Sequence, residues 1–327
     1  MVPRAEFRSY YGRAVLKPPV WTEEIPGYLF TGGLAAGSSM LAAGGDLTGR
    51  PALRTAGRLT SLAALLASAG LLVSDLGRPE RFHHMLRVAK PTSPMSVGTW
   101  VLTAYGLPAG VAAVAEAARP LVARGRLGLL GRLAVGAGRP AGLAAGVVAA
   151  PLATYTAVLL SGTAVPSWHE VHPELPVLFA GSALASGAGV GLLAAAAEDA
   201  GPARRMAVLG GAAELLAGHR LRHGHGLLSE PYQQGKAGRL LSASEKLTAV
   251  GMAGAVVGRR SRVVSALSGA ALLAGSLAAR FGVFEGGVES TKDPKYVVVP
   301  QRERLDARQR AQRVTPSTAG TSSPTTG

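Results

Sequence analysis

Apolar residues along this chain form long runs, and the short segments between them carry most of the charged side chains. A membrane-spanning helix needs about 20 mostly apolar residues, because each residue rises about 1.5 Å through a hydrocarbon core of about 30 Å. Six segments clearly meet this requirement: Tyr28–Asp46, Arg58–Leu76, Val97–Ala118, Ala141–Gly162, Leu175–Ala197 and Val263–Phe284. The pattern predicts an all-α, polytopic integral membrane protein.

Two further apolar segments are weaker candidates. Arg204–Ala217 is short and ends near Glu214, and Leu241–Gly258 carries charged residues near its start, so both depend on packing against neighbouring helices. We therefore expect about eight transmembrane helices within residues 27–288, after a polar interfacial segment of residues 1–26. Residues 289–327 form a polar tail, and its Ser, Thr, Pro and Gly content predicts disorder from about residue 305.

Glycines recur at four-residue spacing inside the predicted spans. The pairs are Gly33 and Gly37, Gly106 and Gly110, Gly142 and Gly146, Gly187 and Gly191, and Gly254 and Gly258. This spacing lets helix backbones approach closely in lipid, where apolar burial between helices no longer drives association. A chain rich in Gly and Ala produces single pairs by chance, but five pairs together favour a tight bundle.

Composition narrows the possible functions. Charged residues make up 16% of the 327 residues, against about 25% in soluble proteins. The formal net charge is +15, but Lys and Arg occupy loops and the tail rather than one amphipathic face, so we predict no nucleic-acid partner. The chain has no cysteine and cannot hold an iron–sulfur cluster or a zinc ion by thiolates. A redox cofactor would be non-covalent or would belong to a partner, and we predict no metal site in this chain.

With eight spans, the loops after the second, fourth and sixth spans share one membrane face with both termini. That face collects all seven histidines and the polar stretch SDLGRPERFHHMLRVAKPTSPMSVGTW, which begins at Ser74. Two interpretations are open for the group Asp75, Arg78, Glu80 and Arg81. It is either an ion-paired loop that ends the helix or a pocket that accepts protons from a reduced quinone. Asp75 and His84 are the candidates for proton handling.

Other polar groups are expected near the same face. Tyr155 lies toward the end of the fourth predicted span, where its hydroxyl would bond to a backbone carbonyl or to a quinone oxygen. Glu214 and Glu285 are carboxylates expected near this face. His219 and His223 share one helix face, which suits a paired arrangement better than haem ligation between facing helices. The chain has 20 Lys and Arg on this side and 13 on the other, but seven of the 20 lie in the tail, so the charge bias leaves the orientation undetermined.

The stretch DLGRPERFHHMLRVAKPTSPMSVGTW, together with YTAVLLSGTAVPSW and RFGVFEGG…DPKYVVVPQRER, resembles the NrfD/PsrC polysulfide-reductase membrane-subunit family, especially its actinobacterial members. The likeness runs from about Pro26 to Arg304. It implies an eight-helix, haem-free membrane anchor without its own iron–sulfur cluster, which binds menaquinone in the bacterial cytoplasmic membrane. It also implies an iron–sulfur partner subunit with several cubane clusters, joined to a molybdopterin catalytic subunit.

The resemblance also points to individual residues. Tyr155 looks like the family's tyrosine on the fourth helix, which lies beside the quinone head group. The family's polar pair before the first helix falls at Trp21–Glu24, where no histidine occurs, so Glu24 is the candidate there. Arg78 and Arg81 complete the predicted cofactor-binding residues. In well-known members of the family, the quinone site and the iron–sulfur partner lie on the outer side of the membrane.

The leading hypothesis is a quinone-reactive subunit of a molybdopterin and iron–sulfur oxidoreductase complex, which is not catalytic alone. It would exchange electrons between menaquinol or menaquinone and the iron–sulfur partner. One alternative is a membrane anchor or proton-path subunit without quinone chemistry. Another is a secondary transporter, but transporters place polar sites at the midplane, whereas the polar groups of this chain are expected to crowd one membrane edge.

Overall fold

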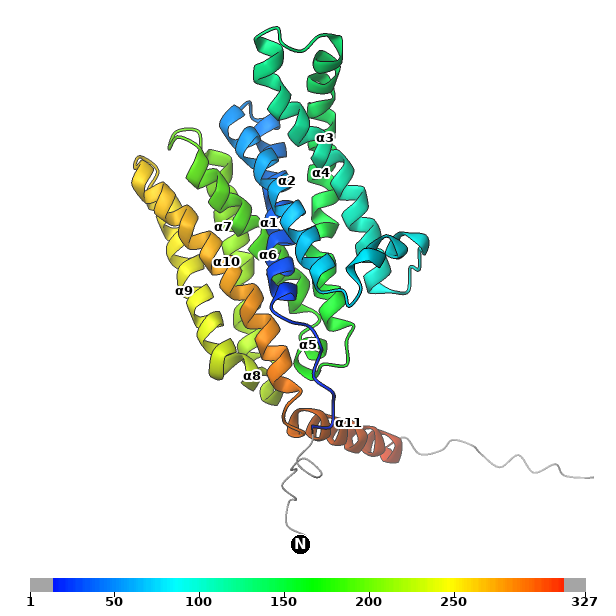
Figure 1. The fold of residues 1–327 in the computed structure, drawn as a ribbon. Helices are drawn as coiled ribbons and strands as arrows, with labels where there is room; N and C mark the ends of the chain where they lie inside the picture. The colour runs from blue at the N-terminus through cyan, green and yellow to red at the C-terminus, as the bar shows by residue number, and fades with distance from the viewer. Residues whose placement is uncertain (1–13, 315–327) are drawn as a thin grey trace, which may run out of the picture.

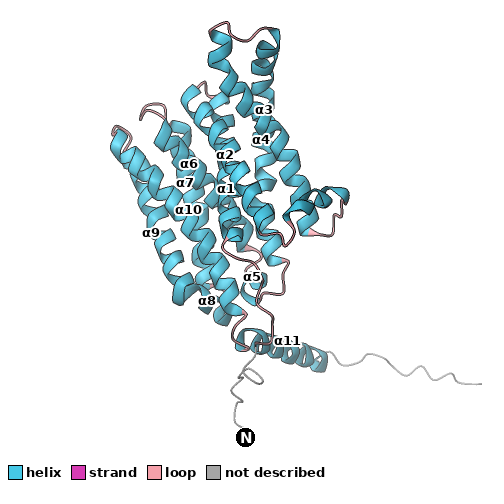
Figure 2. Cartoon of the chain, in the orientation of Figure 1, coloured by secondary structure: helices cyan, strands magenta, loops and turns pink. Residues whose placement is uncertain are grey.

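The computed structural model describes residues 14–314, which form helices and loops without a strand in that range (Figure 2). Eight long helices run alternately up and down one bundle (Figure 1). They are α1 (Glu24–Leu47), α2 (Pro51–Ser74), α3 (Pro94–Ala123), α4 (Leu129–Ser161), α6 (Glu174–Ala194), α7 (Gly201–His223), α9 (Gly235–Val257) and α10 (Arg262–Ser290). The shorter elements are η2 (Pro79–Arg87), α5 (Pro166–Glu170), η3 (Gly226–Ser229) and α8 (Glu230–Gln233), and α11 (Lys295–Val314) follows the bundle. The all-α prediction is confirmed.

Six of the described helices are long and apolar enough to cross a membrane, namely α2, α3, α4, α6, α9 and α10. The prediction of a polytopic membrane protein is therefore confirmed. Helix α9 belongs to this set although its segment was a weak candidate, whereas α1, expected as a clear span, does not. Helices α1 and α7 match α2 and α9 in length, but α1 is rich in Gly and Ser, and α7 carries Arg204, Arg205 and Glu214. Both pack against several neighbouring helices, which is how less apolar helices are accommodated in a bundle.

Local sequence signals explain where two of these helices begin. Ser93 accepts a hydrogen bond from the backbone N–H of Ser96, and Pro94 occupies the first turn of α3. Ser261 accepts a hydrogen bond from the backbone N–H of Val264 at the start of α10. Such side-chain caps satisfy N–H groups that lack a partner within the helix. The cap at Ser93 sets the start of α3, which forms one wall of the site described below.

Helices α1 and α6 cross with their backbones in direct contact. A Cβ atom on Gly37 would lie 1.8 Å from the carbonyl oxygen of Ala183, and one on Gly187 would lie 2.3 Å from the carbonyl carbon of Gly37. Only glycine permits this approach. A Cβ atom on Gly110 would meet nothing within 4 Å, so the spacing of Gly106 and Gly110 does not mark a close crossing.

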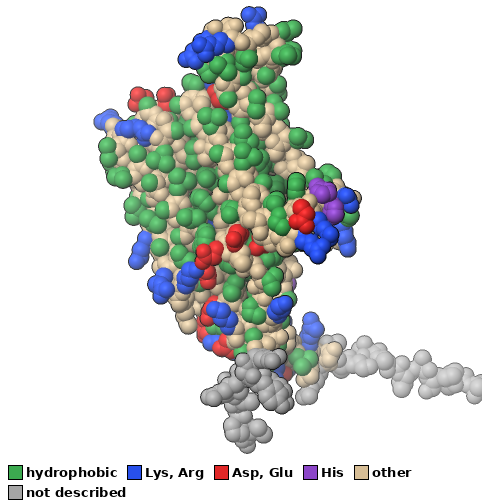
Figure 3. All heavy atoms as spheres, in the orientation of Figure 1, with side chains coloured by type: hydrophobic (Ala, Val, Ile, Leu, Met, Phe, Trp, Pro, Cys, Tyr) green, Lys and Arg blue, Asp and Glu red, His purple; other side chains and the backbone are tan. Residues whose placement is uncertain are grey.

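The two ends of the bundle differ. Helices α5, α8 and α11 lie at one end, α11 runs across that end, and the hairpin with η2 projects from the side (Figure 1). Hydrophobic side chains cover most of the visible long helices, and histidines appear on the projecting hairpin (Figure 3). The Lys295 ammonium donates a hydrogen bond of 2.7 Å to Glu230 and so ties α11 to α8. Helix α11 extends through Val314, beyond the point near residue 305 where disorder was expected, and residues 315–327 lie outside the described range.

Candidate functional site

A pocket opens at the end of the bundle where α1 and α3 begin and α2 and α4 finish. Its wall is mostly aliphatic, and Met85 of the η2 hairpin and Met95 of α3 contribute to it. Asp75, directly after α2, and Tyr155, near the end of α4, line the pocket together. The structure therefore brings one predicted proton acceptor and one predicted quinone contact into the same site.

Two tyrosine hydroxyls in this pocket have no hydrogen bond within the described part of the chain. Tyr28 is buried at 3% exposure and lines the pocket with Tyr155, and neither hydroxyl bonds to any residue between 14 and 314. A Cβ atom on Gly98 would lie 2.4 Å from the Tyr155 ring, so this glycine leaves the space that the ring occupies. Buried tyrosine hydroxyls usually find a partner. Both hydroxyls are therefore available to a bound ligand.

Thr22 joins the pocket to the membrane edge. Its hydroxyl lies 3.1 Å from Asp75 Oδ1 and also hydrogen-bonds to the carboxylate of Glu24 at the start of α1. One hydroxyl thus contacts two predicted site residues that come from different parts of the chain. Asp75 is partly covered, whereas Thr22 is exposed, so the chain of contacts leads from the pocket toward water.

The other predicted site residues lie outside the pocket. Arg78, Arg81 and His84 are exposed on the η2 hairpin, and none of them lines the pocket. The His84 ring packs edge to face against His83, with 4.4 Å between ring centroids. No ion pair joins Asp75, Arg78 and Arg81 in the described part of the chain. The proposed roles of Arg78, Arg81 and His84 stay predictions.

The sequence analysis missed Tyr28, Gly98 and the bridging role of Thr22. Tyr28 lies in the first turns of a helix otherwise rich in Gly, Ala and Ser. Its phenolic hydroxyl was the one feature of the sequence that could have indicated a ligand contact there. Gly98 has no second glycine at four-residue spacing. It lies on α3 and packs against the ring of Tyr155 on α4. These three roles depend on how α1, α3 and α4 pack together.

Charged side chains also lie inside the bundle, which corrects the expectation that polar groups crowd one edge. At the end opposite the pocket, Arg58 bonds to Asp46 at 2.5 Å and to Glu116 at 3.0 Å. Arg54 bonds to the other oxygen of Glu116, also at 3.0 Å. Arg58, Asp46 and Glu116 have almost no exposed side-chain surface. Together they form a buried ion cluster between α1, α2 and α3.

A second set of interior charges lies between α6, α7, α9 and α10. Glu214 accepts hydrogen bonds from Ser244 and Thr248 at 3.1 and 3.3 Å. The sequence analysis expected Glu214 near the membrane face. It lies well inside α7 instead, because this helix is longer than its predicted segment. Arg280 donates to the carbonyl oxygen of Phe179 at 2.8 Å. Glu285 lies at the pocket end of the bundle and pairs with a lysine of α9.

Comparison with known families covers the part of the chain that contains the pocket. A family profile described as polysulphide reductase, NrfD, matches residues 14–209. The chain belongs to the NrfD polysulphide reductase family. The matched range extends from α1 into α7, so it includes the polar stretch from Ser74 to Trp100 and Tyr155. No curated protein matches the chain significantly.

Family membership and the apolar helices together define the kind of protein. The chain is a multi-pass membrane protein of the NrfD family, consistent with a membrane subunit of a molybdoenzyme complex. The third resembling stretch, which begins at Arg280, lies beyond the matched range. The NrfD match therefore contains all four long helices that build the pocket, together with α6 and the first part of α7.

Proposed function

We propose that this NrfD-family protein is the quinone-reactive subunit of a molybdopterin and iron–sulfur oxidoreductase complex in a bacterial cytoplasmic membrane. It exchanges electrons between menaquinol or menaquinone and an iron–sulfur partner and is not catalytic alone. The observation that carries the proposal is the pocket in which Asp75 lies with Tyr28 and Tyr155, whose hydroxyls have no bonds within the described residues. Family membership supports the same function.

The pocket residues suit a quinone in their chemistry. Aliphatic walls accommodate an apolar ring and tail, and the hydroxyls of Tyr28 and Tyr155 can donate hydrogen bonds to carbonyl oxygens. Bound menaquinone would supply the transfer of two electrons together with two protons. The cavity is about 80 Å³, less than the roughly 300–1,000 Å³ of most ligand pockets. The flexible side chains of Met85 and Met95 must therefore shift to admit a head group.

Asp75, Thr22 and Glu24 provide a route for a proton out of this pocket. A hydroxyl has one hydrogen to donate and can accept another bond. When Asp75 is protonated, its carboxylic acid can donate to the Thr22 oxygen while Thr22 donates to the Glu24 carboxylate. Movement of both hydrogens along these bonds transfers one proton from Asp75 to Glu24 and leaves Thr22 neutral. Rotation of the Thr22 hydroxyl then restores the starting arrangement.

The iron–sulfur partner would dock at the end formed by α5, α8 and α11. A groove there is lined by His169 of α5 and by Tyr296 and Arg304 of α11. Trp168 of α5 is buried and stacks on Trp21, which lines the pocket, with 5.8 Å between ring centroids. This contact links α5, whose His169 lines the groove, to the pocket wall, so a partner bound there would lie close to the site of electron exchange.

The second candidate, an anchor or proton-path subunit without quinone chemistry, is favoured by one face of α2. Arg58, Ser61, Ser68 and Asp75 follow one another at spacings of three or seven residues, which places them on the same side of the helix. Ser61 bonds to Tyr105 at 2.9 Å. Ser68 is buried, and its hydroxyl has no partner among residues 14–314. The row therefore extends from the ion cluster to the pocket, but its hydrogen bonds are interrupted at Ser68.

The decisive experiment is purification of the native complex in mild detergent, followed by identification of its subunits, extracted quinone and absorption spectrum. The proposal predicts menaquinone and an iron–sulfur subunit without haem bands. An iron–sulfur subunit without menaquinone would overturn the proposal and favour the anchor function, and a protein that purifies alone and without quinone would contradict both functions.

In the purified complex, Asp75→Asn tests the pocket directly. The variant should assemble normally but reduce the iron–sulfur subunit from menaquinol at least tenfold more slowly, because an amide cannot accept the proton that Asp75 accepts. Glu80→Gln, at an exposed position of the same hairpin, is the matched control. Loss of assembly in Asp75→Asn alone would assign Asp75 a structural role at the end of α2.

A further inference from the structure

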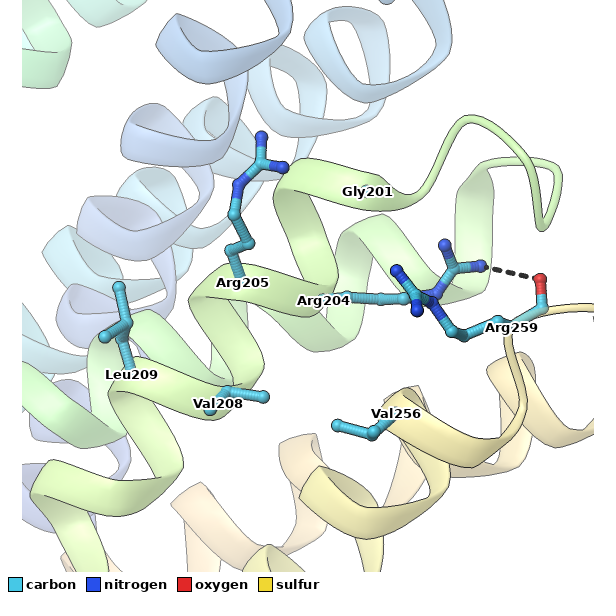
Figure 4. A pocket seen from close by; sticks show the side chains of 7 residues that line it. All are labelled: Gly201, Arg204, Arg205, Val208, Leu209, Val256 and Arg259. Carbon is cyan, nitrogen blue, oxygen red and sulfur yellow. Dashed lines mark hydrogen bonds between the residues drawn. The ribbon is translucent and has the colours of Figure 1, made fainter.

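A basic pocket lies at the end of the bundle opposite the quinone pocket, where α7 begins and α9 ends. Its volume is about 440 Å³, and three arginines and three aliphatic residues contribute to its wall. They are Arg204, Arg205, Arg259, Val208, Leu209 and Val256 (Figure 4). The family match ends at residue 209, and the proposed quinone chemistry uses none of these side chains.

The arginines of this pocket form no ion pair with an acidic residue in the part of the chain that the structure describes. Arg204 donates to the backbone oxygen of Arg259 at 3.2 Å, and the two guanidinium groups lie on the same side of α7 (Figure 4). The Arg204 Nε atom is buried without a hydrogen-bond partner in the described structure. Glu198 and Asp199 are exposed in the loop before α7, yet no ion pair joins either of them to the pocket arginines within residues 14–314. Like charges so close together favour a bound anion.

The aliphatic residues lie deeper along the same two helices. Val208 and Leu209 follow Arg204 and Arg205 by one helical turn on α7. Val256 lies in the last turn of α9, and Arg259 lies in the turn that follows this helix. Leu209 is 67% exposed and Val256 49% exposed, so both face the surrounding lipid. The pocket thus places positive charge at the membrane edge and apolar surface toward the membrane interior.

We propose that this pocket binds an anionic phospholipid. The phosphate group contacts Arg204 and Arg259, with Arg205 at the rim, and an acyl chain covers Leu209 and Val256. Basic pockets between transmembrane helices at a membrane edge bind anionic head groups in this manner. A free phosphate ion would satisfy the arginines but leave the aliphatic wall uncovered, which is why the geometry favours a lipid.

Lipid titration of the purified full-length protein tests the proposal. After delipidation in mild detergent, phosphatidylglycerol or phosphatidylcholine is added, and bound lipid is counted by native mass spectrometry while the melting temperature is recorded. Phosphatidylglycerol should bind and raise the melting temperature, and phosphatidylcholine should do neither. Equal binding of the two lipids would overturn the proposal.

Two soluble probes separate a lipid site from a simple anion site. Inorganic phosphate and glycerophosphoglycerol, the head group without acyl chains, should not raise the melting temperature at concentrations where phosphatidylglycerol does. Protection by either probe equal to that by the lipid would show that the site binds an anion and not a phospholipid.

Variants locate the binding site. Arg259→Gln should weaken phosphatidylglycerol binding about fivefold, the effect of one arginine near a lipid surface, and Arg205→Gln should weaken it in the same direction. Arg260→Gln removes a neighbouring exposed charge that does not line the pocket and should leave the affinity unchanged. An equal loss in Arg260→Gln would show that general surface charge, and not this pocket, attracts the lipid.

Discussion

The chemistry of the proposed quinone pocket depends on very few polar atoms in an aliphatic wall. Tyr28 and Tyr155 have hydroxyls without a bond to any residue between 14 and 314, and Asp75 is the one carboxylate among the described residues that line the pocket. Because each atom has few competing partners within the protein, removal of a single hydroxyl should change one ligand interaction and little else. Single-atom substitutions are therefore the most informative at this scale.

Tyr155→Phe should weaken menaquinol binding by about 1 kcal/mol, or roughly fivefold, because it removes one hydrogen bond while keeping the ring that packs on Gly98. The apparent affinity follows from the menaquinol dependence of turnover in the purified complex. Thr154→Val is the control, since its hydroxyl bonds only within its own helix. An unchanged affinity in Tyr155→Phe would remove this tyrosine from the site.

Thr22→Val keeps the shape of the side chain and removes the hydroxyl between Asp75 and Glu24. If this hydroxyl carries the proton, kcat should fall severalfold while KM for menaquinol stays unchanged, and Thr22→Ser should restore the rate. Thr31→Val is the control, because Thr31 bonds only to backbone oxygens of its own helix. A parallel rise in KM would instead indicate a disturbed pocket.

Helix crossings set the positions of these side chains. Helix α1 carries Tyr28 and Glu24 on its first turns, and its path is determined by its contact with α6 at Gly37 and Gly187. Because close-packed helix interfaces tolerate little added volume, the orientation of α1, and with it one wall of the pocket, depends on this crossing.

Gly37→Ala should lower the free energy of unfolding by about 1–3 kcal/mol, since the added methyl group would overlap the Ala183 carbonyl and force the helices apart. Gly110→Ala is a matched control from another four-residue pair. A methyl group there meets nothing within 4 Å, and the gain in helix propensity should leave stability equal or slightly higher. Thermal unfolding in detergent, followed by circular dichroism, measures both. Equal loss in the two variants would contradict the close crossing.

The sequence was sufficient to predict the helices but not their contacts. Val97–Ala118 falls within α3 because long apolar runs report directly on the membrane thickness. The predicted segment Arg204–Ala217 is shorter than helix α7, because a hydropathy pattern treats Glu214 as an interruption of the apolar run. In the bundle, hydroxyl groups of α9 donate hydrogen bonds to Glu214. The contact between Thr22 and Asp75 joins residues from different helix ends, and no local pattern predicts such a pairing.

In the whole molecule, the polar functions are divided between the two ends of the bundle. The end with α5, α8 and α11 carries the proposed quinone pocket and the proposed docking surface, and the opposite end carries the buried ion cluster and the proposed lipid site. A lipid held at one end and a protein partner at the other would fix the depth of the bundle in the membrane. The position of α11 is therefore important, since this helix crosses the end of the bundle that carries the proposed docking surface (Figure 1).

Glu230 holds α11 to the bundle through two contacts. Its carboxylate accepts hydrogen bonds from Lys295 at 2.7 Å and from Tyr296 at 3.2 Å. The hydrogen bond to Glu230 raises the pKa of Lys295, so the ion pair persists at physiological pH. Because both partners of the ion pair are about one third exposed, solvent screening limits its contribution to about 0.5–1 kcal/mol.

Glu230→Gln should therefore release the first turns of α11 without unfolding the bundle. Backbone amides of residues 297–299 should exchange hydrogen for deuterium about two- to fivefold faster, the factor that corresponds to the loss of this ion pair. Glu289→Gln is the control, because its ion pair with Lys292 is exposed and lies within α10 and the turn after it. In the complex, Glu230→Gln should also retain less iron–sulfur subunit after washing if α11 forms part of the docking surface. Faster exchange with unchanged retention would place the partner elsewhere on this end of the bundle.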